Sequence, residues 1–136
     1  MRIWEDGLWR LSALTHGQVP GFSFLEPKRH VRYVEELDGE EAATFGAVLA
    51  RSSAALKEAA GAERVYVYVF GGGIPHLHLH LAPHTEGDAL SATILRGEVE
   101  TKPGPGGTTL LLATDFPVPP RSTLREVAAR AGELLA

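Results

Sequence analysis

The stretch Pro75-His76-Leu77-His78-Leu79-His80-Leu81-Ala82-Pro83 alternates histidine and leucine without a break between two prolines. Side chains of a β-strand point alternately to its two faces, so the pattern predicts three imidazoles on one face and three leucines on the other. The leucine face is expected to lie in a hydrophobic core. The histidine face needs another explanation, because strand positions that face water usually carry residues such as Lys, Glu or Thr.

Three interpretations of the histidine face compete. The histidines are incidental, or they bind a metal, or they catalyse a reaction at phosphate. The Cα atoms of His76 and His80 are about 13 to 14 Å apart at a rise of about 3.4 Å per residue. A tetrahedral metal ion would therefore need a ligand from elsewhere, such as His30 or His84. In the catalytic interpretation one imidazole attacks and its neighbours handle charge and protons.

The stretch His76–Ala82 fits the His-φ-His-φ-His-φ-φ signature, where φ is apolar, and thereby resembles the histidine-triad family of nucleotide hydrolases and transferases. Upstream, Pro20–Val31 is similar to the glycine, strand and Pro-Lys-basic-His segment of that family. Asp38–Glu41 is similar to its acidic helix start. The likeness runs from about Trp4 to Pro83, which is about three fifths of the chain.

The resemblance implies nucleophilic catalysis at the α-phosphate of a nucleotide. It implies that His78 attacks and forms a nucleotidyl-histidine intermediate, which water or another acceptor then releases. His80 is the candidate to protonate the leaving group, His76 would position the attacking ring, and His30 would support the triad from behind. No metal or other cofactor is expected, because imidazolium and backbone N–H groups can stabilise the developing charge.

The chain departs from the family where phosphate is usually held. Relatives commonly have an Asn on the strand before the triad and a Gln or Ser just before it, whereas residues 68–75 here read Tyr-Val-Phe-Gly-Gly-Gly-Ile-Pro. The glycine triplet fits either a flexible hairpin or a loop whose bare N–H groups approach a phosphate. We therefore take Gly72, Gly73, His84 and Lys28 as candidate phosphate-binding residues.

Composition narrows the class of protein. The chain has 136 residues, 44% hydrophobic and 22% charged, which predicts one soluble domain over 1–136 with a core at about 1–84 and a C-terminal extension at 85–136. No signal pattern and no apolar run of about 20 residues is present, so we expect a cytoplasmic protein with no membrane partner. The absence of cysteine excludes disulfides and thiolate chemistry, and a net charge of -4 argues against a nucleic-acid partner.

The predicted fold class is α+β, an antiparallel sheet of about five strands with one long helix packed on one face and a C-terminal helix. Strands are expected at 3–4, 8–14, 21–26, 65–70 and 109–113, together with the triad strand and a short strand or loop at 98–100. Val65–Phe70 is apolar on both faces and is expected to be central. A short helix is expected at 88–95 and a connecting loop at 103–107.

Both main helices carry cap signals. Asp38 with Glu41 forms a predicted capping box for a helix that Gly61 ends, and Thr123 with Glu126 forms another for the C-terminal helix. The C-terminal helix could cover a sheet edge, contact a dimer partner or shape the substrate pocket.

The resemblance also implies a homodimer with joined sheets and a nucleotide as the small-molecule substrate. Relatives act on dinucleoside polyphosphates, nucleoside phosphoramidates and adenylylated compounds. Two alternatives stay open. One is a cupin-like metal-binding protein that uses two strand histidines with Glu86 and a later histidine, although no histidine follows His84. The other is a nucleotide-binding protein that kept the fold but lost turnover.

Overall fold

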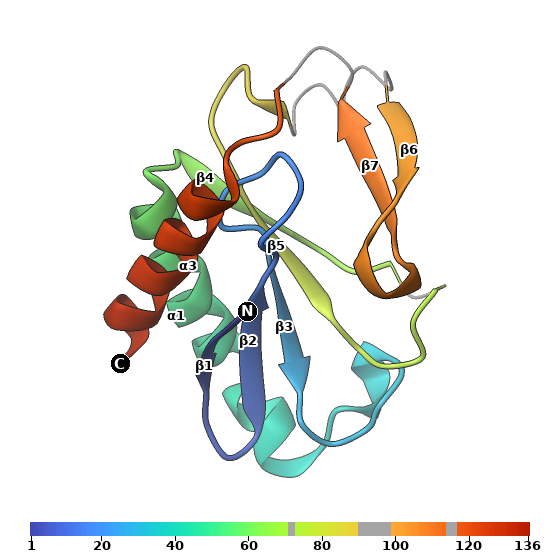
Figure 1. Ribbon diagram of the computed structural model, residues 1–136. Coiled ribbons are helices and arrows are strands. Elements are labelled where there is room, and N and C mark those ends of the chain that lie inside the picture. The colour runs from blue at the N-terminus through green and yellow to red at the C-terminus, as the bar shows by residue number, and fades with distance from the viewer. Residues whose placement is uncertain (71–72, 90–98, 114–116) are drawn as a thin grey trace.

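The computed structural model describes residues 1–70, 73–89, 99–113 and 117–136, and it confirms the predicted α+β class. A five-stranded sheet has the order β1-β2-β3-β5-β4 with every neighbouring pair antiparallel, and β6 and β7 form a separate two-stranded sheet (Figure 1). The strands are β1 (Arg2–Glu5), β2 (Trp9–Ala13), β3 (Ser23–Pro27), β4 (Arg64–Tyr68), β5 (Leu79–His84), β6 (Val99–Pro103) and β7 (Thr109–Ala113). The helices are α1 (Gly39–Ala60) and α3 (Arg121–Leu135), and short 3-10 turns cover Val34–Glu36 and Pro105–Gly107.

The triad stretch keeps its predicted alternation although only part of it is a strand. β5 begins at Leu79, so of the triad only His80 lies within it. Before the strand, the Leu77 N–H donates to the carbonyl of Val31 at 2.7 Å, and this bond joins the segment to a loop instead of a sheet neighbour. Leu77 is nevertheless 2% exposed, and the histidines on either side of it lie on the opposite face of the segment.

The register explains why one face of the sheet is apolar and the other carries the histidines. On the core face, Leu79 lies opposite Leu25 of β3, and Leu81 lies opposite Val67 of β4. On the other face, His80 is flanked by Phe24 and Tyr68. Because side chains alternate along every strand, the pairing that buries the leucines also aligns the polar and aromatic residues of the histidine face.

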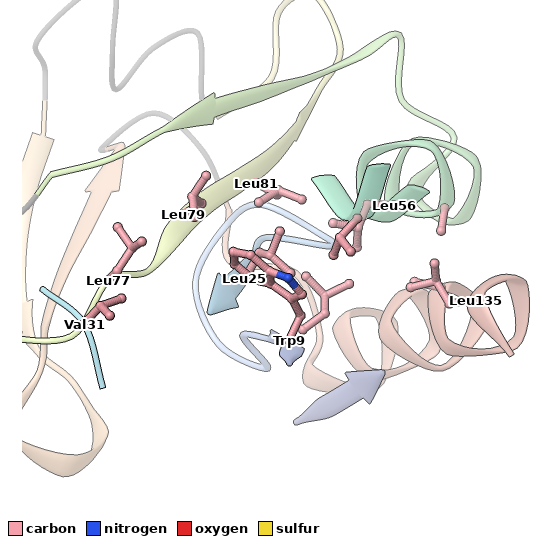
Figure 2. Packing of buried hydrophobic residues seen from close by; sticks show 12 residues of the cluster. Trp9, Leu25, Val31, Leu56, Leu77, Leu79, Leu81 and Leu135 are labelled. Atoms are coloured by element: carbon pink, nitrogen blue, oxygen red, sulfur yellow. The ribbon is translucent and has the colours of Figure 1, made fainter. Parts of the chain in front are cut away.

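The leucine face packs against α1, as the sequence predicts. Trp9, Leu25, Leu56 and Leu81 are fully buried and belong to one cluster (Figure 2). Trp9 thus belongs to the core, and its indole N–H donates to the Thr44 hydroxyl of α1 at 3.2 Å. Helix α1 contacts β2, β3, β4 and β5, so it supports β5, the strand that contains His80, from the core side of the sheet.

The ends of α1 are partly as predicted. Asp38 is the N-cap and its carboxylate accepts from the Gly39 N–H at 2.8 Å, while Gly61 ends the helix in the left-handed conformation with φ of 62°. The predicted capping box is wrong, because the Glu41 carboxylate accepts from Arg29 instead of from the Asp38 N–H. The bond to the guanidinium joins two opposite charges, whereas in a capping box the Glu41 carboxylate would accept from an uncharged N–H group.

The prediction that Val65–Phe70 is a central strand is wrong. β4 lies at the edge of the sheet because β5 is inserted between it and β3. Tyr66, Val67 and Val69 are each 41% exposed, and Phe70 is 69% exposed. The strand is therefore apolar on both faces and lacks the burial on both faces that such a pattern usually indicates.

The C-terminal helix α3 packs beside α1 and next to the edge strand β1. α3 begins at Arg121 with Pro120 as N-cap, so the capping box predicted at Thr123 and Glu126 is wrong and the helix starts three residues earlier. It packs on α1 and β1, and a Cβ at Gly132 would lie 3.0 Å from the Ile3 carbonyl oxygen. Of the roles considered for the tail, covering a sheet edge is the one this chain shows.

Strands β6 and β7 form a β-hairpin that stands apart from both helices (Figure 1). β7 matches the predicted strand 109–113, and β6 is longer than the short strand expected at 98–100. The helix expected at 88–95 lies almost entirely outside the described residues. Across the described ranges, neither helix is long and apolar enough to span a bilayer.

Candidate active site

The ring of His78 is held by the backbone of the residue two positions before it. His78 Nδ1 lies 2.8 Å from the carbonyl oxygen of His76. A carbonyl oxygen only accepts, so Nδ1 carries the hydrogen and donates it. In a neutral imidazole the other nitrogen then has a free lone pair, and Nε2 of His78 is a nucleophile.

His76 is bonded at both ring nitrogens. Its Nε2–H donates to the carbonyl oxygen of Pro27 at 2.9 Å, and its Nδ1 lies 3.3 Å from Nδ1 of His30. The two rings stack with centroids 5.4 Å apart at 19°. One hydrogen between the two Nδ1 atoms satisfies both, so His30 fixes the orientation of His76. The resemblance implied that His30 lies close to the triad, and the structure brings the two side chains together.

A carboxylate lies behind His76. Glu26 Oε2 is 3.8 Å from His76 Nε2 and accepts from Arg10 Nε at 2.8 Å. Arg10 and Glu26 face each other across β2 and β3 on the histidine face of the sheet. This ion pair places a fixed negative charge close to the first histidine of the triad.

His80 sits in a less polar environment than the other two histidines. Its Nδ1 donates to the Tyr68 carbonyl oxygen at 3.3 Å, which leaves Nε2 at the opposite end of the ring. Burial lowers the pKa of His80, the bond to Tyr68 partly opposes this, and the neighbouring His78 lowers the pKa further. The lowered pKa favours the neutral form of His80 at pH 7.

The ring of Phe24 contacts both His78 and His80. Its ring makes edge contacts with both, with centroids 5.4 Å from His78 and 5.1 Å from His80. The two imidazole centroids are 5.0 Å apart. A single phosphate group can contact both rings at this separation, so the geometry suits attack by one imidazole and proton transfer by the other.

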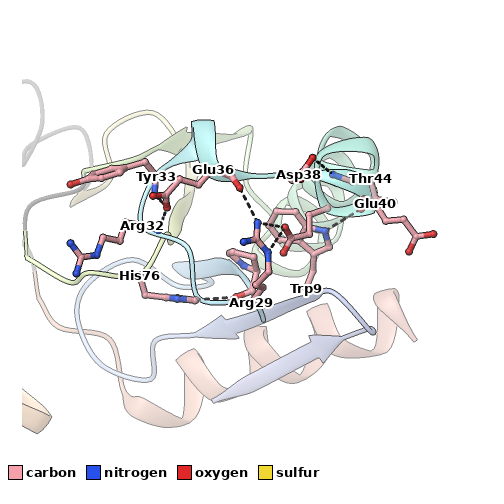
Figure 3. A network of polar contacts seen from close by, with 12 residues as sticks. Trp9, Arg29, Arg32, Tyr33, Glu36, Asp38, Glu40, Thr44 and His76 are labelled. Atoms are coloured by element: carbon pink, nitrogen blue, oxygen red, sulfur yellow. Dashed lines mark hydrogen bonds and ion pairs between the residues drawn. The ribbon is translucent and has the colours of Figure 1, made fainter.

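The loop that carries His30 is anchored to the start of α1 by Arg29 (Figure 3). Arg29 donates to the Glu41 carboxylate at 2.7 and 2.9 Å and to the Glu36 carbonyl oxygen at 2.8 Å. The bond to Glu41 raises the pKa of Arg29, and the backbone N–H groups of Arg32 and Tyr33 lower the pKa of Glu36. These bonds connect the long helix to the residue that supports His76.

Two of the candidate phosphate-binding side chains, those of Lys28 and His84, contact carboxylates. The Lys28 ammonium lies 3.4 Å from the Glu5 carboxylate. His84 is 3% exposed, and its Nδ1 lies 2.9 Å from Asp88 Oδ1. Gly73 has open space where a Cβ would be, and Gly72 lies outside the described residues.

The described ranges contain no group of three His, Cys, Asp or Glu side chains arranged to hold a metal ion. The cupin-like alternative also meets a difficulty in the fold, because cupins are double-sheet jelly rolls and this chain has one five-stranded sheet with helices.

Several residues of the site were missed by reasoning from the sequence. They are Arg10, Phe22, Phe24, Glu26, Tyr68 and Phe70. The sequence held one signal for them. Phe22 and Phe24 are two residues apart, as are Tyr68 and Phe70, and residues at this spacing lie on the same face of a strand. Which face each pair occupies depends on strand pairing, which local sequence leaves open.

Comparison with known proteins bears on the fold of the chain. No protein-family model and no curated protein matches the chain. Among solved structures, the histidine triad protein from Bradyrhizobium japonicum aligns with a TM-score of 0.73 and 19% identity, covering 100% of this chain and 90% of that chain. A histidine triad protein from Sinorhizobium meliloti aligns at 0.66 and 24% identity, covering 98% and 87%. A zinc-bound histidine triad family protein from Mycobacterium smegmatis aligns at 0.63 and 21% identity, covering 98% and 84%.

The chain therefore has the fold of the histidine-triad proteins. The resemblance predicted from residues 76–82 is confirmed by solved structures that align over nearly the whole chain. At these identities the likeness establishes the fold, and the chemistry has to be argued from the residues of this chain.

Proposed function

We propose that the protein binds a nucleotide and transfers its nucleotidyl group to His78, then to water or another acceptor. The observation that carries this proposal is the 2.8 Å bond from His78 Nδ1 to the His76 carbonyl oxygen, because it leaves the lone pair on Nε2. The family resemblance supplies the α-phosphate as the reacting centre.

In the first step, the Nε2 lone pair of His78 forms a bond to phosphorus as the bond from phosphorus to the leaving group breaks. The leaving group departs with that electron pair and takes a proton from Nε2 of His80. The lowered pKa favours the neutral form of His80, and a bound phosphate provides the negative charge that favours its protonation. In the second step, His80 takes a proton from water as the water oxygen attacks phosphorus and the N–P bond breaks.

His76 and His30 are assigned the support of the nucleophile. The His76 backbone orients His78, and the bond to His30 holds the His76 ring. We expect no metal to be required, and we expect backbone N–H groups of the loop that includes Gly72 and Gly73 to help hold phosphate. Lys28 would have to leave Glu5, and His84 its contact with Asp88, before either could do so.

The test is release of nucleoside monophosphate from adenosine phosphoramidate and dinucleoside polyphosphates by metal-stripped protein. His78→Ala is expected to lower the rate by at least about 10³-fold. His16→Ala, which removes a histidine outside the triad, is the matched control and is expected to keep the rate. Mass spectrometry of denatured protein should detect the nucleotidyl adduct in the parent. Turnover that survives in His78→Ala would overturn the proposal.

Zinc binding is the second candidate, favoured by the zinc-bound neighbour from Mycobacterium smegmatis. Elemental analysis of the purified protein, followed by activity with and without the metal, separates it from the first. Tight nucleotide binding without release of product would instead indicate a non-catalytic nucleotide-binding protein.

We also propose a homodimer in which a second copy covers β4. This edge strand exposes Tyr66 and Val67, and the segment just after it exposes Val69 and Phe70. Unpaired strand edges with apolar side chains are sites where another chain adds on. A monomer in sedimentation at micromolar concentration would contradict the dimer.

A further inference from the structure

His80 is surrounded by aromatic rings to a greater degree than the other triad histidines. Ring centroids lie at 4.7 Å for Tyr68, 5.1 Å for Phe24, 5.8 Å for Phe22 and 5.9 Å for Phe70. The contacts come from β3 and the residue just before it, and from β4 and the segment just after it. The strands on both sides of β5 therefore enclose one imidazole.

Tyr68 differs from the three phenylalanines in its geometry. Its ring is nearly parallel to the imidazole, at 8°, whereas Phe24 and Phe22 approach edge-on at 74° and 66°. The Tyr68 backbone carbonyl also accepts the hydrogen of His80 Nδ1. One residue thus covers a face of the imidazole and sets which nitrogen carries the hydrogen.

The two contacts fix the ring in different ways. The carbonyl alone would leave the imidazole free to tilt, because a 3.3 Å bond tolerates a range of angles. The stacked ring removes that freedom by occupying the space into which the imidazole would turn. It also offers a π face to the imidazolium form, and a cation is attracted to the negative face of an aromatic ring.

The attraction between a cation and the Tyr68 ring matters because the proposed reaction needs a protonated His80. Burial disfavours a charged His80, yet the acid must be charged when the leaving group departs. A stacked aromatic ring favours the cation without adding a negative charge that would repel phosphate.

We propose that Tyr68 is a positioning residue for His80, holding the imidazole so that Nε2 faces the leaving group and stabilising its protonated form. The inference rests on the proposed role of His80 as the acid. The ring of Tyr68 performs the positioning, and its hydroxyl is not required.

The first experiment tests the positioning without turnover. Nitrogen-15 NMR of the histidine rings distinguishes which nitrogen carries the hydrogen, in the parent, Tyr68→Phe and Tyr68→Leu. The hydrogen of His80 is expected on Nδ1 in the parent and in Tyr68→Phe, and distributed over both nitrogens in Tyr68→Leu. Tyr66→Leu is the matched control, because its ring lies on the same strand but 5.0 Å from His84 instead. An unchanged His80 in Tyr68→Leu would overturn the proposal.

The second experiment tests the acid role through the leaving group. Phenyl and 4-nitrophenyl esters of adenosine monophosphate differ in how much the departing oxygen needs a proton. Tyr68→Leu is expected to slow the phenyl ester at least 10-fold more than the nitrophenyl ester, and Tyr68→Phe to restore the parent ratio. Equal slowing of both esters would overturn the role.

The two experiments separate failure of the inference from failure of the proposed function. If the parent cleaves neither these esters nor adenosine phosphoramidate and dinucleoside polyphosphates, the proposed function fails and the NMR comparison alone decides whether Tyr68 positions His80. If the parent cleaves both and the variants behave alike in both experiments, the proposed function stands and the inference fails.

Discussion

Replacing one buried serine with alanine should make this protein more stable. Ser52 lies in the middle of α1, 1% exposed, and its hydroxyl oxygen has no hydrogen-bond partner among the described residues. Val48 and Leu56, one turn before and one turn after it, are buried in the hydrophobic cluster. The hydroxyl therefore loses its bonds to water on folding without replacing them.

The magnitude follows from three terms. An unsatisfied buried hydroxyl costs about 1 to 3 kcal/mol. Alanine favours a helix over serine by about 0.5 kcal/mol. Removing an oxygen of roughly 12 Å³ leaves a small void that costs about 0.3 kcal/mol. The free energy of unfolding of Ser52→Ala should thus rise by about 2 kcal/mol, which is roughly 6 °C in Tm for a chain of this length.

The assay is urea unfolding of Ser52→Ala beside Ser53→Ala, at one protein concentration because a dimer would make stability depend on concentration. Ser53 is the next residue of the same helix and is only partly buried, so its variant measures the helix preference alone. Ser52→Ala should exceed Ser53→Ala by about 1 to 2 kcal/mol. An equal or smaller gain would show that the Ser52 hydroxyl is satisfied and refute the reasoning.

Three further outcomes test the core, the site and the sheet edge. Leu81→Ala should lower the free energy of unfolding by about 3 to 4 kcal/mol, because Leu81 is 0% exposed, whereas Val118→Ala, at a residue 56% exposed, should change it by less than about 0.5 kcal/mol. Burial lowers the pKa of His80, so the unfolded chain binds a proton at His80 more tightly than the folded chain does. The urea concentration at the midpoint of unfolding should therefore be lower at pH 5.5 than at pH 7, and His80→Gln should make this difference smaller. Val67→Lys should give monomers in sedimentation, while Val34→Lys, at a residue 43% exposed and outside β4, should leave the dimer intact; dimers in both would refute the β4 interface.

The sequence by itself determined the class of fold and the alternation that places the histidines on one face. Alternation of histidine and leucine over residues 76–81 holds in the structure even where the segment is not a strand, because burial of the leucines settles the orientation of every neighbour. The N-cap at Asp38 and the glycine at Gly61 marked the limits of α1, since both act within one turn of the helix.

Predictions failed where a distant partner competed with a local one. Glu41 was expected to cap its own helix and instead binds Arg29, which is twelve residues away in the sequence. The Val65–Phe70 pattern indicated burial on both faces, yet β5 occupies the place beside β3 and leaves β4 at the edge. Neither outcome is written in the local pattern, because each depends on which segments meet in space.

Only the tertiary structure decided what surrounds the histidines. The proline carbonyl on His76, the aromatic rings around His80 and the Arg10–Glu26 pair come from β2, β3 and β4, brought together by the strand order. The motif shows in the sequence because its three histidines lie at close and regular spacing. Contacts with distant segments set the hydrogen positions of His76 and His80, through the carbonyls of Pro27 and Tyr68. The hydrogen of His78 is placed locally, by the His76 carbonyl two residues earlier.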